Sequence, residues 1–379
     1  MIFRAVALVK GVPDTFLSVQ IANAGFLAAG YAGLLWLSAM LFPDPRARHL
    51  TFSLLLFCAQ PIIFCSFTYG IVPGLCFAVW AIVFQTLWFR RSKLVYGLLS
   101  ALCIGLAVLF KSNYLIALIA MAVVAAVRLL KRKQYIKDIA VILAACVCAF
   151  SFSPAVQVLY ERRSGVTLEP GLPYISWIAM GLSESQRAPG WYSDVTSNVK
   201  FEELGSDAEA LSAYSKEVIA ERIAYFRENP QYTRDFFYRK FVSQFNETSY
   251  QSIWNNNVRE QYEEKRQPAA WVCGDGEAAV KRYMDVFAQA VFVGLLIALC
   301  LMLRRRDYTA LILPLTVLGG MLFHLLAEGK SQYILPYFVL MIPAAAWGMT
   351  FCCDGFDRLT DRLWKKKKTS GGQAEEEKT

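Results

Sequence analysis

Long apolar runs separated by polar connections fill most of this chain and constrain its fold more than any other feature. Several runs approach the ~20 residues that a helix needs to cross the hydrocarbon core of a bilayer. In lipid the backbone must satisfy its hydrogen bonds internally, which favours helix. The sequence therefore predicts an all-α polytopic membrane protein with about nine transmembrane helices. The predicted spans are Phe16–Leu41, Thr51–Phe67, Val72–Phe89, Tyr96–Phe110, Tyr114–Leu130, Ile139–Leu159, Val286–Leu303, Tyr308–Leu325 and Ile334–Cys352.

The composition places most of the chain in lipid. Hydrophobic residues make up 56% of the sequence and charged residues 18%, with a mean hydropathy of +0.37. Soluble domains average about 25% charged residues, which they need for a polar surface. The formal charge of +9 does not indicate nucleic-acid binding, because Lys and Arg fall in alternate connections and not along one face. We expect an integral protein of a bacterial plasma membrane, in contact with membrane lipid and not with nucleic acid.

Basic residues mark every second connection between the runs. The positive-inside rule places such connections in the cytoplasm. The intervening connections, 68–71, 111–113, 161–285 and 327–333, then lie outside the cytoplasm. The basic connections contain Arg46 and Arg48; Arg90, Arg91 and Lys93; Arg128, Lys131, Arg132, Lys133 and Lys137; Arg304, Arg305 and Arg306; and Arg358, Arg362 and Lys365–Lys368.

This alternation divides the chain into five regions. An odd number of spans leaves the N-terminal region outside, without a secretory signal to carry it there. We expect that an odd number of spans precedes Met1 in the intact protein; a short N-terminus that crosses unaided is the alternative. The regions are an outer N-terminal segment (1–15), six spans (16–160), a mainly helical extracytoplasmic segment (161–285), three spans (286–353) and a charged cytoplasmic tail (354–379).

The cysteines and histidines indicate neither a disulfide framework nor a zinc site. Of the ten cysteines, Cys273 alone lies in the extracytoplasmic segment, and no CxxC pattern occurs. The two histidines, His49 and His324, are too few for a zinc site of their own. The outer carboxylates are spread along the chain, so we expect no cofactor, with a divalent cation as the alternative.

The extracytoplasmic segment combines predicted helices with aromatic, amide-rich stretches. Apolar residues at helical spacing predict helices over Ala208–Arg227 and Tyr232–Gln244. Phe241–Trp254 is dense in aromatic and amide side chains, and Pro173–Gly181 and Pro189–Asp194 are typical of surface loops. A segment of this kind, anchored at both ends in the bilayer, is suited to bind sugar rings at the membrane surface. The alternative is a small folded cap whose aromatics form its own core.

Ionisable residues gather near the outer ends of the spans, where a charge needs a partner or a function. Lys111 follows an apolar run, and Lys330 lies in the turn between the last two spans. Either lysine can bind a lipid-linked phosphate as a point charge, although snorkelling to headgroups explains each one alone equally well. We interpret the group as one substrate-binding site on the outer face. Its predicted members are Tyr69, Lys111, Lys240, Glu247, His324, Glu328, Lys330 and Tyr333.

Short motifs follow one another in a fixed order along most of Asn23–Gly348. They are PIIFCSFTYG from Pro61 to Gly70, Phe110–Asn113, Pro173–Gly181, Gly190–Tyr192, Lys240 with Gln244–Glu247, and Phe323–Pro336. In these motifs, their order and the topology, the chain resembles GT-C glycosyltransferases of the protein O-mannosyltransferase and aminoarabinose-transferase type, in particular bacterial family 39-like membrane proteins.

The resemblance implies transfer of a sugar from a polyprenyl-phosphate donor to a hydroxyl of a protein, lipid or glycan outside the membrane. That chemistry needs a carboxylate to take the acceptor proton and cations to stabilise the leaving phosphate. The lack of any glycine-rich phosphate loop agrees with a donor that is not a nucleotide sugar. By the resemblance, Lys111 and Lys330 would contact the donor phosphate, Glu247 and Glu328 would orient acceptor, sugar or cation, and His324 and Tyr333 would shape the pocket.

The resemblance also implies a catalytic aspartate in a first outer loop, and we expect this chain to begin after that loop. Asp14 is the one acidic residue before the first run, but its surroundings do not match the family's acidic motif, so the catalytic residue is unassigned. Two further function classes remain open. One is a transporter or flippase for lipid-linked sugars, which predicts polar residues midway through several spans. The other is a non-catalytic subunit or pseudoenzyme, working with a partner that supplies N-terminal helices.

Overall fold

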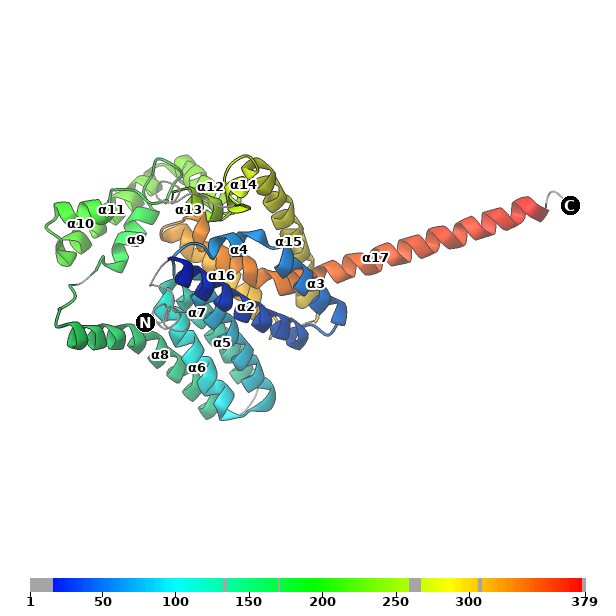
Figure 1. The fold of residues 1–379 in the computed structure, drawn as a ribbon, viewed down its shortest axis with the longest axis horizontal. Coiled ribbons are helices and arrows are strands. Elements are labelled where there is room, and N and C mark those ends of the chain that lie inside the picture. The colour runs from blue at the N-terminus through cyan, green and yellow to red at the C-terminus, as the bar shows by residue number, and fades with distance from the viewer. Residues whose placement is uncertain (1–15, 132–134, 170, 259–266, 306–308, 377–379) are drawn as a thin grey trace.

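Helices make up all the regular secondary structure in the residues that the computed structural model describes, which are 16–131, 135–169, 171–258, 267–305 and 309–376 (Figure 1). This agrees with the predicted fold class. Among the described residues, six helices are long and apolar enough to cross a membrane, and α6 (Leu94–Phe110) and α16 (Ile312–Leu326) are apolar but shorter. The six are α2 (Phe16–Leu41), α5 (Ile71–Arg91), α7 (Leu115–Lys131), α8 (Tyr135–Ser164), α15 (Glu277–Arg305) and the first part of α17 (Leu335–Glu376).

One predicted span is broken in two. The run Thr51–Phe67 contributes to α3 (Pro45–Phe57) and α4 (Ala59–Phe64), with Cys58 between them in an extended conformation at φ −75° and ψ 90°. Pro61 accounts for the break, because in a continuous helix its ring would meet the carbonyl four residues earlier and leave that carbonyl without a donor. Helices of 13 and 6 residues are too short to cross a bilayer alone. The expected single span is therefore replaced by a bent pair of short helices.

Small residues let the spanning helices pack closely. Helices α2 and α6 pack on α5, and α3 and α15 pack on the first part of α17; α5 and α17 are the most buried of the long spans. Where α15 meets α17, a Cβ on Gly348 would lie 1.9 Å from the carbonyl oxygen of Gly294. Such close approach of two backbones is typical of helix pairs in lipid, where van der Waals packing drives association.

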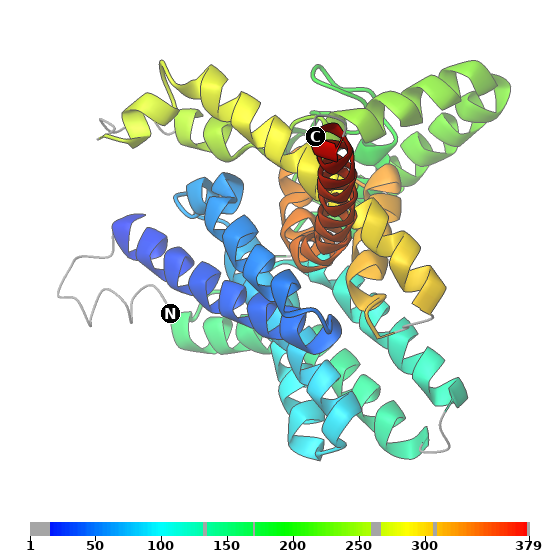
Figure 2. The same cartoon turned by 90° about the vertical axis from the view of Figure 1, so that its right-hand side faces the viewer.

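The described connections fall at two ends of the bundle (Figure 1). At one end Lys111 contacts Tyr69, from the connection before α5. At the other end the Arg46 guanidinium pairs with Asp354 at 2.8 Å. Figures 1 and 2 both show the helices α9 to α14 together above the bundle, beside the first end, whereas α17 runs away from it (Figure 1). That the first end faces outward stays a prediction.

The chain between α8 and α15 folds into short helices around an aromatic core. Both predicted helices are confirmed, as α11 and α12. The rings of Phe226 and Phe236, one from each, pack with centroids 5.0 Å apart beside buried Leu182. Part of the aromatic content thus forms the core of a cap. The helices are α9 (Tyr174–Gly181), α10 (Asn198–Glu203), α11 (Ala208–Glu228), α12 (Pro230–Phe245), α13 (Ser252–Val258) and α14 (Ala269–Val272).

Pro173–Gly181 is mostly helix and not the predicted surface loop. Ser176, Ala179 and Met180 are buried on α9, which packs against α11 and α16. Their spacing of three and four residues places them on one helical face. The face is small and partly polar, so its apolar periodicity is weak in the sequence. Burial against two neighbouring helices, and not local propensity, accounts for this helix.

Candidate functional site

Lys111 lies between two tyrosines at the end of α6. Its backbone is extended and separates α6 from the 3-10 turn η1 (Ser112–Tyr114). The ammonium donates to the Tyr69 hydroxyl at 2.5 Å and lies 4.4 Å from the centre of that ring and 4.8 Å from the ring of Tyr333. Ring faces carry negative charge density and attract a cation. Three residues from three separate connections thus meet at one end of the bundle.

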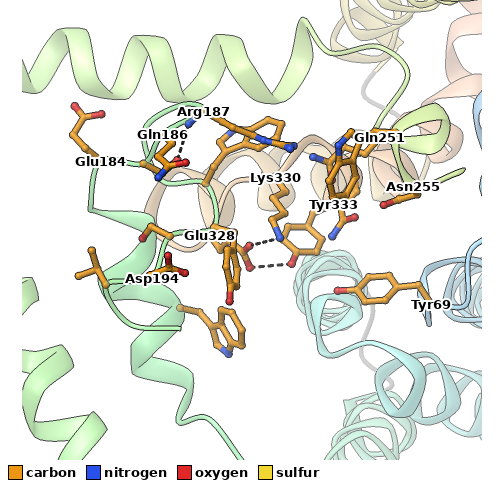
Figure 3. Close-up of a pocket in the computed structure, with 18 of the residues that line it drawn as sticks. Tyr69, Glu184, Gln186, Arg187, Asp194, Gln251, Asn255, Glu328, Lys330 and Tyr333 are labelled. Carbon is orange, nitrogen blue, oxygen red and sulfur yellow. Dashed lines mark hydrogen bonds and ion pairs between the residues drawn. The ribbon is translucent and has the colours of Figure 1, made fainter. Parts of the chain in front are cut away.

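Glu328 is a buried carboxylate in the connection between α16 and the 3-10 turn η3 (Ser331–Tyr333), with 5% of its surface exposed. The Tyr333 hydroxyl donates to Oε2 at 2.9 Å, and the Lys330 ammonium pairs with Oε1 at 3.2 Å. Figure 3 shows Glu328 joined to both residues by dashed lines. Burying a carboxylate is costly unless it is paired and hydrogen-bonded. This pair of contacts supplies that condition.

His324, on α16, contacts the connection that carries Glu328. Its Nδ1 lies 2.8 Å from the backbone oxygen of Glu328, and its Nε2 lies 3.4 Å from the side-chain nitrogen of Asn113. A carbonyl only accepts, so Nδ1 carries the proton and Nε2 accepts from the amide. The imidazole also stacks on Tyr333, with centroids 5.4 Å apart. These contacts hold His324 beside Tyr333 and the connection that carries Glu328.

Two cavities meet at this cluster. The larger encloses about 940 Å³ between the α9–α10 connection, α13 and η3, and the smaller about 340 Å³ beside η1, α9 and α16. Both volumes fall in the range of roughly 300–1,000 Å³ typical of ligand pockets. Tyr69, Trp177, Glu328 and Tyr333 line both cavities. The larger cavity is also lined by Arg187, Trp191, Tyr192, Trp254, Asn255 and Lys330, and the smaller by Lys111, Asn113, Tyr174, Ile178, Phe323 and His324.

Lys240 lies behind the cavities and lines neither. Its side chain, on α12, is fully buried, and the ammonium donates to the carbonyl oxygens of Gly181 at 2.5 Å, Leu325 at 2.9 Å and Ala327 at 2.8 Å. An ammonium has three donors, so all of its hydrogen bonds are made within the protein. Lys240 therefore ties the end of α9 to the connection that carries Glu328, and its contacts favour a positioning role over substrate binding.

Because of Lys240, the folded protein is expected to gain stability as pH rises from 7 to 10. Burial lowers the pKa of its ammonium from 10.5 to about 7, and the nearby Glu328 carboxylate opposes that shift. Between these values the unfolded chain binds more protons than the folded one. The free energy of unfolding therefore increases with pH, by at most about 1.4 kcal/mol per pH unit, and the gain ends above the unfolded pKa.

Melting temperatures of purified protein between pH 7 and pH 9 measure this gain. Lys240→Met should lose the pH-dependent rise, whereas Lys216→Met, at an exposed position on α11, should keep it. Equal slopes for the wild-type protein and Lys240→Met would show that the ammonium is not the titrating group.

Glu247 is also bound inside the fold. Its carboxylate accepts from the Ser331 hydroxyl at 2.6 Å, from the backbone N–H of Gln251 at 2.8 Å and from the Ser249 hydroxyl. These contacts tie the α12–α13 connection to η3, and Glu247 lines neither cavity. Six of the eight predicted site residues thus gather at the cavities. The other two, Lys240 and Glu247, support the connections that form them.

Several residues of the larger cavity were not singled out from the sequence. Trp177 lies on α9, in the stretch predicted as a loop, and Arg187 and Asn255 belong to no motif. The side chain of Arg187 lies 4.7 Å from the centre of the Trp254 ring. An exposed tryptophan beside amides in Phe241–Trp254 was the available signal, but a single sequence does not show which distant segment faces it.

Two further expectations concern Asp14, as a candidate catalytic residue, and a divalent cation, as the alternative to no cofactor. Asp14 lies outside the described residues. Within the part of the chain that the structure describes, no group of three or more His, Cys, Asp or Glu side chains is placed to hold a metal ion. The only carboxylate in the shared wall of the two cavities, among the residues described there, is Glu328.

Comparisons with known proteins place the chain in a family. Neither the curated proteins nor the solved structures contain a match to it. A family model with the description conserved hypothetical integral membrane protein matches residues 48–350, well over half of the chain. The matched range includes Tyr69, Lys111, Glu328 and Tyr333, and the apolar helices agree with its description. The chain therefore belongs to this family of conserved hypothetical integral membrane proteins.

Proposed function

We propose that this protein is a glycosyltransferase that moves a sugar from a polyprenyl-phosphate donor to an acceptor hydroxyl at the outer face of the membrane. The observation that carries the proposal is the buried carboxylate of Glu328 in the wall between two cavities of different chemistry. A transfer reaction needs two substrates held side by side, with a proton acceptor within reach of the attacking hydroxyl. The paired cavities supply that arrangement.

The smaller cavity suits a lipid-linked phosphate. Lys111 supplies a cation at its wall, and Tyr174, Ile178 and Phe323, which also line it, are 76%, 39% and 44% exposed. A polyprenyl phosphate joins an anion to a long apolar chain. The phosphate would lie at the lysine as at a point charge, and the chain would cover the exposed apolar side chains on its way into lipid.

The proposed reaction is a direct displacement at the sugar's anomeric carbon. The acceptor hydroxyl, in the larger cavity, gives its proton to Glu328 while its oxygen forms the new bond to the anomeric carbon. The bond from that carbon to the phosphate oxygen breaks, and its electron pair stays on the phosphate. Lys111 stabilises the negative charge that develops there. Lys330 pairs with Oε1 of Glu328 at 3.2 Å and helps to hold that carboxylate in place.

A transfer assay with defined donors tests the proposal. The full chain, purified into lipid nanodiscs, would be incubated with synthetic polyprenyl-phosphate hexoses and pentoses labelled in the sugar, together with an envelope extract of the source cells as acceptor. We expect label to move into the acceptor fraction and unlabelled polyprenyl phosphate to appear in equal amount. Heat-treated protein serves as the blank.

The same material separates the other function classes. In sealed liposomes, a flippase would move the labelled donor across the bilayer without chemical change. A non-catalytic subunit would neither consume nor transport the donor. Either result, obtained with folded protein and with all donors tried, would overturn the proposal.

A further inference from the structure

Three residues that line the larger cavity each have a buried polar side-chain atom that lacks a hydrogen-bond partner. The atoms are Ser193 Oγ, Asn255 Nδ2 and Glu328 Oε1, the last of which has only its ion pair with Lys330. Asn255 and Glu328 are 3% and 5% exposed. Buried polar groups are nearly always hydrogen-bonded, because an unpaired one has lost its hydration. Unpaired atoms from three separate segments on one cavity indicate a ligand that brings both donors and acceptors.

Aromatic rings face the same cavity. Trp254 and Tyr192, both lining residues, are 44% and 40% exposed. The Arg187 guanidinium lies 4.7 Å from the centre of the Trp254 ring, and the Lys330 ammonium lies 4.6 Å from that of Tyr192. These cations order the rings while much ring surface stays open. The C–H faces of a sugar ring carry slight positive charge and stack on the negative faces of aromatic rings.

Two glycines, Gly190 and Gly329, hold the loop that contains Trp191 and Tyr192 beside Glu328. The backbone N–H of Gly329 donates to the carbonyl oxygen of Gly190 at 2.8 Å. Gly190 has φ +73°, and a Cβ there would lie 2.3 Å from Cε of Lys240, so any other residue would be strained and crowded. Trp191, the next residue, donates its indole N–H to the Ser243 hydroxyl at 2.9 Å. The loop that carries Tyr192 is therefore preorganised relative to the carboxylate.

The remaining lining favours an uncharged polar ligand. Cations and carboxylates both occur among the lining residues, which include Arg187, Lys330, Asp194, Glu184 and Glu328 (Figure 3). The Glu184 carboxylate pairs at 2.9 Å with Arg239, which is not part of the lining. Mixed signs give no net attraction for a strongly anionic or cationic ligand. Val195 is the one aliphatic side chain among the described residues that line it. The apolar part of the lining therefore comes mainly from aromatic rings, on whose faces sugar rings stack.

We infer that the larger cavity binds an uncharged carbohydrate, so that the acceptor of the transfer is a glycan and not a peptide or a lipid chain. This inference names the second substrate of the proposed function. That the bound glycan acts as an acceptor rests on the proposed function. Sugar rings stack on Trp254 and Tyr192, ring hydroxyls pair with Ser193 and Asn255, and the hydroxyl that reaches Glu328 Oε1 receives the sugar. A cavity of about 940 Å³ is at the upper end of the range for small-molecule pockets and accepts a short oligosaccharide.

Binding of glycans in the absence of any donor tests the inference. The full chain in nanodiscs would be screened against an array of neutral oligosaccharides of two to four sugars, with Ser- and Thr-containing peptides as competitors, and hits would be titrated by calorimetry. We expect at least one neutral glycan to bind. Trp254→Ala should weaken that binding about tenfold or more, as for a central aromatic contact, and Asn255→Ser should weaken it less. Trp271→Ala, at a position 49% exposed that lines neither cavity, is the matched control.

The outcomes separate this inference from the proposed function. Sugar transfer to a peptide or lipid, with no neutral glycan bound across the array, overturns the inference and leaves the transferase standing. Glycan binding that Trp254→Ala weakens and Trp271→Ala does not supports the cavity assignment even if no donor is ever consumed, a result that would count against the transferase alone. Equal binding by both variants places the glycan elsewhere and overturns the assignment.

Discussion

Glu328→Gln is expected to lower the rate of sugar transfer by about 10²–10⁴-fold, the usual effect of losing a general base. The amide has nearly the shape of the carboxylate, and its oxygen can still accept from the Tyr333 hydroxyl, which lies 2.9 Å from Oε2. It cannot take a proton from the acceptor. The loss should appear in kcat, measured on purified protein at saturating labelled donor. Donor affinity should change little, because the proposed site of the donor phosphate is at Lys111 and not at Glu328.

Two further variants separate proton transfer from ion pairing. Lys330→Gln removes the partner of Glu328 Oε1, 3.2 Å away, but keeps the carboxylate, so it should cost much less than Glu328→Gln. Glu203→Gln changes a carboxylate on α10 whose side chain is 57% exposed and paired with Lys200, so it should leave transfer unchanged. Equal losses in Glu328→Gln and Lys330→Gln would mean that Glu328 serves to hold Lys330. Full activity in Glu328→Gln would exclude it as the base.

The spanning helices could be predicted because lipid makes each segment satisfy its own backbone hydrogen bonds, so a long apolar run determines its own structure. Helix α2 has the predicted bounds, Phe16–Leu41. Helix ends were less predictable. Helix α15 begins at Glu277 and not at Val286. Met284 in this extension is buried in a cluster with Ile253, and Glu277 and Lys281 form an i,i+4 pair at 2.6 Å that adds a little stability to the polar first turn. Hydropathy does not detect such a turn.

The site was predictable only where topology alone brings residues together. The alternation of basic connections placed Tyr69, Lys111 and Tyr333 at the same end of the bundle, and they are in contact. The sequence did not reveal the partners of Lys240, because they are backbone carbonyls, and every residue has one. Which carbonyls converge on a buried ammonium depends on how α9, α12 and α16 pack, and no residue type marks that packing in a single sequence.

Lys111→Met is expected to lower the rate of transfer by about 10²–10³-fold, the effect typical of removing one preorganised electrostatic contact to a developing charge. Methionine keeps most of the length and apolar surface of the side chain but removes the cation between Tyr69 and Tyr333. Lys111→Arg should recover part of the activity, since a guanidinium also pairs with phosphate and stacks on rings. Rates at saturating donor and donor dissociation constants, measured separately, show whether the lysine acts on the bound donor or on the transition state.

The opposing interpretation is that Lys111 only anchors the end of α6 at the headgroups. In that case Lys111→Met would lower the melting temperature and leave kcat per folded molecule unchanged, and Lys93→Met, which removes another exposed lysine at a helix end, would behave alike. Tyr69→Phe removes the hydroxyl that accepts from the ammonium at 2.5 Å but leaves the charge, so it should cost less than Lys111→Met. The positive charge would be identified as the feature that the reaction needs by the following order of transfer rates. Lys111→Met should be slower than Tyr69→Phe, and Lys111→Arg should lie between Lys111→Met and the wild-type protein.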